Sequence, residues 1–83
     1  MTTRKFFCTF PQKLISEPLI SHTLGAKYDV VPNIRAASIS DSQAHVVVEI
    51  EGDEDKIEES VVYLRDRGVE VAEIREGDEL PSF

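Results

Sequence analysis

The segment from residue 44 to residue 68 constrains the fold most, because a strand pattern runs directly into a helix pattern. Over residues 44–51 the apolar side chains alternate with mostly polar ones, which is the period of a half-buried strand. Three acidic residues then stand where a helix N-terminus favours negative charge, and apolar residues recur at helical spacing up to Gly68. We predict a strand over 44–51 and a helix from about Asp53 to Gly68. The apolar positions of this helix are Ile57, Val61 and Leu64.

Local composition predicts the other elements. The predicted strands cover residues 5–10, 29–41 and 69–74, and a first helix covers residues 17–27. Ser16 is the expected N-cap of that helix, and Ile20 and Leu24 give it an apolar stripe. Pro32 cannot donate a hydrogen bond to a neighbouring strand, so the 29–41 strand is predicted either to lie at a sheet edge or to contain a bulge.

The order of these elements is βαββαβ, and it predicts the fold class. Two right-handed crossover units interleaved in this order give a ferredoxin-like α+β fold: a four-stranded antiparallel sheet with two helices on one face. The chain has 83 residues, enough for one domain with a small core. We predict a single domain over residues 1–75 and a flexible acidic tail over residues 76–83.

Composition argues against several functions. The formal net charge of -7 disfavours binding to nucleic acid, and no stretch approaches the length of a membrane span or a signal peptide. Cys8 is the only cysteine and alternates with Phe6 and Phe10, so we place it in the core. We interpret His22 and His45 as solvated imidazoles, and expect no metal, no cofactor, no membrane insertion and a cytoplasmic location.

The acidic side chains between residues 49 and 59 do not have the spacing of a calcium loop. We interpret them as a solvated surface and a helix N-terminus. These residues are Glu49, Glu51, Asp53, Glu54, Asp55, Glu58 and Glu59.

Several short patterns resemble one known family. They are Glu17-Pro18-Leu19-Ile20, Tyr28-Asp29-Val30, Asn33 to Ile39, Val48-x-Ile50-x-Gly52 and Leu64-x-x-x-Gly68-Val69. Together they resemble the NIL domain over roughly residues 5–75. Such domains occur at the C-terminus of methionine-importer ATPase subunits, where they bind methionine and inhibit transport, and also fused to iron–sulfur domains.

The resemblance implies a ligand site at residues 33–35. Asn33 is the matching polar residue, Ile34 lies beside it, and Arg35 stands where the family has leucine. The Arg35 guanidinium could pair with the carboxylate of an amino acid, or it could fill the apolar slot that a thioether would need. Both readings remain open at the level of sequence.

A homodimer is predicted from the side chains on the helix-free face. Phe7 and Val47 lie on central strands and point away from the predicted core. Large apolar residues on an open sheet face suggest cover by another subunit, either on that face or at an edge strand. We therefore expect Phe7 and Val47 at a dimer interface.

These observations favour a binding protein over an enzyme. The leading hypothesis is a non-catalytic regulatory module for a small ligand such as an amino acid, methionine being the ligand that the resemblance implies. The alternative is a protein–protein adaptor for a larger enzyme, transporter or iron–sulfur protein. Acylphosphatases share the βαββαβ order, but the expected glycine-rich phosphate loop after the first strand is absent from residues 11–15. We therefore predict no catalytic residues.

Overall fold

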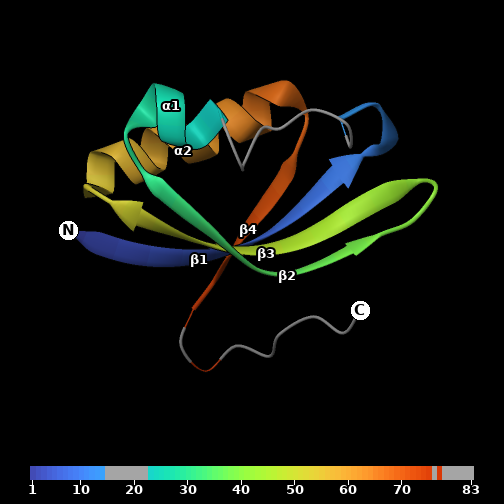
Figure 1. Ribbon diagram of the computed structural model, residues 1–83, viewed down its shortest axis with the longest axis horizontal. Helices are drawn as coiled ribbons and strands as arrows, with labels where there is room; N and C mark the ends of the chain where they lie inside the picture. The colour runs from blue at the N-terminus through green and yellow to red at the C-terminus, as the bar shows by residue number, and fades with distance from the viewer. Residues whose placement is uncertain (15–22, 76, 78–83) are drawn as a thin grey trace.

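The computed structural model describes residues 1–14, 23–75 and 77. Its elements are β1 (Thr2–Pro11), the 3-10 turn η1 (Gln12–Leu14), α1 (Gly25–Tyr28), β2 (Val31–Ile39), β3 (Gln43–Gly52), α2 (Glu54–Arg67) and β4 (Glu70–Ile74). All paired strands are antiparallel, in the order β2-β3-β1-β4, and α1 and α2 lie on one face of the sheet (Figure 1). The predicted ferredoxin-like α+β fold is confirmed.

The element boundaries differ from the predicted ones mainly at β1 and α1. β1 begins at Thr2, earlier than the predicted residue 5, because it pairs with β3 along its whole length. Of the helix predicted over residues 17–27, the described part contains α-helix from Gly25 to Tyr28 only. Ser16, Ile20 and most of the predicted tail over 76–83 lie outside the described residues.

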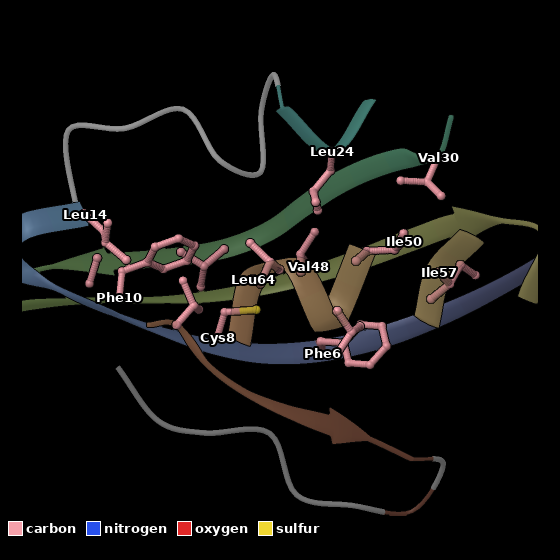
Figure 2. Close-up of a cluster of buried hydrophobic side chains, with 14 residues drawn as sticks. Phe6, Cys8, Phe10, Leu14, Leu24, Val30, Val48, Ile50, Ile57 and Leu64 are labelled. Atoms are coloured by element: carbon pink, nitrogen blue, oxygen red, sulfur yellow. The ribbon is translucent and has the colours of Figure 1, made fainter. Parts of the chain in front are cut away.

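The hydrophobic core fills the layer between the sheet and the helices (Figure 2). Alternate side chains of β1 and β3 point into this layer, as the period-two patterns predicted. They meet one face of α2 and the buried residues Leu24 and Val30. The contributors from the three central elements are Phe6, Cys8, Phe10, Val46, Val48, Ile50, Ile57, Val61 and Leu64, all of them buried.

Helix α2 ends as its sequence predicts. Gly68 has φ of 104°, a left-handed conformation that glycine adopts without a steric penalty. The Gly68 N–H donates to the Arg65 carbonyl and the Val69 N–H donates to the Leu64 carbonyl, each at 3.0 Å. Val69 is buried against the same core as Leu64. This arrangement satisfies the last carbonyls of the helix and turns the chain into β4.

Strand β2 lies at the edge of the sheet and contains a bulge. Pro32 pairs in register with Ile50, and the pairing shifts by one residue between Ile34 and Ala36. Both alternatives predicted for this strand therefore hold, although the extra residue is Arg35 and not a neighbour of Pro32. The bulge decides which β2 side chains share a face.

Candidate functional site

Strand β2 places Asn33 and Arg35 on the helix-free face of the sheet, with Ile34 on the other face between them. Asn33 is in register with Glu49 of β3, and the Arg35 Nε lies 2.8 Å from the Glu49 Oε1. The Arg35 side chain is 63% exposed and the Glu49 side chain 27% exposed, so the pair is open to solvent on its Arg35 side. An amide, a guanidinium and a carboxylate thus gather at one exposed edge.

Ile34 lies apart from the other two predicted site residues. It is in register with Val48, whose side chain points into the core, so Ile34 faces the helix side of the sheet. It is 51% exposed there. Alternation along a strand separates neighbouring side chains, and the expected three-residue cluster is therefore split between two faces.

Glu49 is the site residue that the sequence analysis missed. It was assigned to a solvated acidic surface, whereas the structure pairs it with Arg35. The period-two pattern of residues 44–51 could have placed Glu49 on the helix-free face. Its partner could not be found that way, because the register with β2 depends on the bulge.

The helix-free face carries the predicted interface residues as a cross-strand pair. Phe7 is in register with Val47, and it is partly buried while Val47 is only 4% exposed within the chain. Phe7 is therefore the more accessible of the two predicted interface residues. Phe7 also borders a small hollow of about 160 Å³ with Thr9 and Ala72.

His45 is half-buried on this face, so its imidazole is only partly solvated. Its ring stacks on Phe7 with centroids 5.5 Å apart and planes 9° apart. The His45 Nδ1 lies 3.3 Å from Thr9 Oγ1, and its Nε2 lies 2.9 Å from the Gln43 Nε2. Aromatic stacking and polar contacts to two strands hold the ring in place. His22 lies outside the described residues.

Arg4 forms an ion-pair cluster that local patterns did not predict. Its Nε and Nη2 donate to the two carboxylate oxygens of Glu73 on β4, at 2.9 and 2.8 Å. Its Nη1 donates to Glu54 at 2.8 Å and to Glu58 at 2.7 Å, both on α2. The Arg4 guanidinium holds the pKa of Glu73 below its usual value. We call these four residues the Arg4 cluster; it joins β1, β4 and α2.

Cys8 occupies the core position that the alternation predicted. It is fully buried, and burial raises the pKa of its thiol to about 12. At neutral pH the side chain therefore behaves as a small apolar group. In the described part of the chain, no group of three or more His, Cys, Asp and Glu side chains could hold a metal ion. The described helices include none that is long and apolar enough to cross a membrane.

Comparison with solved structures supports the fold. The C-terminal domain of an ABC transporter ATP-binding protein from Enterococcus faecalis matches with a TM-score of 0.75 and 24% sequence identity. The match covers 92% of this chain and 86% of that domain. At this identity the likeness shows a shared fold. No curated protein matches the chain in sequence.

The family follows from the sequence itself. Residues 8–73 match the NIL domain, a span that begins within β1 and ends within β4. This span includes the β2 bulge, Glu49 and the capped end of α2. The resemblance noted in the short patterns is confirmed, and the chain belongs to the NIL domain family.

Proposed function

We propose that this NIL domain is a non-catalytic regulatory module that binds a free amino acid at the β2 edge. The observation that carries the proposal is the exposed Arg35–Glu49 pair with Asn33 in register beside it. An amino acid carries one carboxylate and one ammonium group, and this edge offers a guanidinium and a carboxylate. The two pairs of charges are complementary.

The chemistry of each residue defines its role. The Arg35 guanidinium can receive the ligand carboxylate through two parallel hydrogen bonds. The Glu49 carboxylate then receives the ammonium group, and the Asn33 amide fixes the orientation of the ligand. The Arg35 side chain is 63% exposed and does not fill an apolar slot. Its exposure therefore favours a role in pairing with a ligand carboxylate.

Methionine is the first ligand to test, because of the family to which the chain belongs. We further propose a cytoplasmic homodimer in which Phe7 on the helix-free face contacts the partner subunit. Such a dimer would place a second chain close to the edge that carries Asn33 and Arg35. Sedimentation that shows a monomer at high concentration would contradict the dimer.

The test is thermal unfolding of the purified chain with a panel of amino acids. A ligand at about 100 times its Kd stabilises a protein by roughly 2.7 kcal/mol, which for a domain of this size raises the Tm by about 10–20 °C. We expect Asn33→Ala, Arg35→Gln and Glu49→Gln to remove most of the ligand-induced shift.

Glu51→Gln is the matched control for Glu49→Gln. Glu51 lies on the same face of β3, two residues further on, and is in register with Val31. Its replacement changes the net charge equally and should leave the ligand-induced shift intact. The absence of a shift with any amino acid, or equal loss in both glutamate variants, would overturn the proposed function.

A further inference from the structure

A second surface feature lies on the helix side of the sheet, opposite the β2 site. It is a shallow hollow of about 530 Å³ between α1 and α2. Lys27 and Tyr28 of α1 line one side, and Val62, Tyr63 and Asp66 of α2 line the other. None of these residues belongs to the proposed amino-acid site. We call this feature the α1–α2 hollow.

Two tyrosine rings form part of its wall. The Tyr28 and Tyr63 rings have centroids 5.4 Å apart and are tilted by 48°. The Lys27 Nζ lies 5.6 Å from the Tyr28 centroid and 4.9 Å from the Tyr63 centroid. The faces of aromatic rings attract cations within about 6 Å. The ring pair therefore already accepts an ammonium group, supplied by the chain itself.

The rest of the hollow favours a cationic ligand that also has an apolar part. Glu59 and Asp66 are exposed and line it with negative charge. Val62 is 50% exposed between them on α2, so an apolar contact is available beside the carboxylates. Lys27 is exposed, and because cation–π contacts at exposed sites are weak, a competing cation can displace it at small cost.

We propose that the α1–α2 hollow binds an arginine- or lysine-bearing segment of a partner protein. The cationic group would take the place of Lys27 over the tyrosine rings, with Glu59 and Asp66 beside it, and an apolar side chain of the same segment would cover Val62. Charge complementarity selects this partner, because the chain has a net charge of -7 and would repel an acidic one. A peptide can supply both a cation for the tyrosine rings and an apolar side chain for Val62.

The experiment titrates the peptide acetyl-Arg-Leu-Arg-amide into the full ¹⁵N-labelled chain at low salt. Chemical-shift changes should concentrate at Lys27, Tyr28, Val62, Tyr63 and Asp66. The same peptide with citrulline in place of arginine keeps the shape and removes the charge, and it should cause no such changes. Changes spread over all acidic surfaces would overturn the proposal.

Two double variants with equal net charge separate the site from general electrostatics. Glu59→Gln combined with Asp66→Asn removes charge from the hollow, whereas Glu51→Gln combined with Asp41→Asn removes charge from β3 and the β2–β3 turn. We expect the first to raise the Kd of the peptide at least fivefold and the second less than twofold. Equal effects would overturn the proposal.

Lys27 provides a test with the opposite sign. Lys27→Gln vacates the tyrosine rings, so the peptide should bind three- to fivefold more tightly. Lys5→Gln is the control, because it changes the net charge equally and Lys5 lies on the helix-free face, in register with Glu49. Weaker or unchanged binding in Lys27→Gln would contradict the role of the rings. Concentration-dependent shifts at the hollow without peptide would show a second copy as its occupant and overturn the proposed partner.

Discussion

Replacing Arg4 with glutamine tests how the sheet and α2 are held together. Arg4 is only 17% exposed in its side chain and contacts the three carboxylates of the Arg4 cluster on two other elements. Glutamine keeps part of the stem but cannot reach three carboxylates or carry charge. The variant leaves Glu54, Glu58 and Glu73 close together without their shared cation.

The expected loss of stability can be worked out from the geometry. The two-point contact with Glu73, which is 28% exposed, is worth about 1.5–2 kcal/mol as a hydrogen-bonded charged pair. The contacts to Glu54 and Glu58 are more exposed, at 61% and 54%, and solvent screening limits each to about 0.3–0.5 kcal/mol. The sum is about 2–3 kcal/mol, a large share of the roughly 4–12 kcal/mol expected for a domain of this size.

The assay is urea unfolding at pH 7, with the free energy extrapolated to water. Arg35→Gln is the matched control, because loss of the exposed Arg35–Glu49 pair should lower the free energy of unfolding by less than about 0.7 kcal/mol. If the two variants lose the same free energy of unfolding, the three-element Arg4 cluster contributes no more than an ordinary surface pair. That result would contradict a stabilising role for the Arg4 cluster.

The difference in the free energy of unfolding between wild type and Arg4→Gln should also depend on pH. The pKa of Glu73 is lowered in the folded state, chiefly by its hydrogen bonds to Arg4. A lowered folded-state pKa contributes stability that is present above the unfolded-state pKa and lost as the pH falls through the folded-state pKa. The stability difference should therefore be full at pH 7 and shrink below about pH 4.3, the usual pKa of a glutamate. A difference that persists at pH 2 would contradict an electrostatic origin.

Three further predictions concern buried or conformationally special positions. Gly52→Ala should lower the free energy of unfolding in urea by about 1–3 kcal/mol, because the added Cβ would lie 2.9 Å from the Val30 Cγ1. Adding Val30→Ala to this variant should partly restore the stability. Gly68→Ala should cost about 1–2 kcal/mol because φ is 104°, whereas Gly25→Ala, with its nearest contact at 3.6 Å, should cost little by the same measurement. Cys8, whose thiol pKa is raised to about 12, should react with a thiol reagent at pH 8 at least 100-fold more slowly in the native chain than in urea.

Local patterns in the sequence were sufficient to predict the strands and helices that bury one face. The alternation of residues 44–51 and the helical spacing of Ile57, Val61 and Leu64 match β3 and α2, and the core contains the predicted side chains. The left-handed glycine at the end of α2 was also predictable. Each of these features depends on residues close in sequence, so the periodicity of one segment is enough to reveal it.

The candidate site was only partly predictable. Asn33 and Arg35 were named from the family resemblance, but Ile34 turned out to face the other side of the sheet and Glu49 was missed. Alternation along β2 turns Ile34 away from Asn33 and Arg35. The pairing with Glu49 depends on the register between β2 and β3, which includes a bulge at Arg35 that nothing in the local composition fixes.

The order of strands and helices, the family and most of the core residues can be read from the amino-acid sequence. The side-chain pairs become visible in the folded chain: Arg35 with Glu49, Arg4 with Glu73 at a separation of 69 residues, and Tyr28 with Tyr63. Secondary structure and burial follow from the polarity of near neighbours. Contacts between side chains depend instead on strand register and on how the helices pack across the sheet, which bring together residues far apart in the chain.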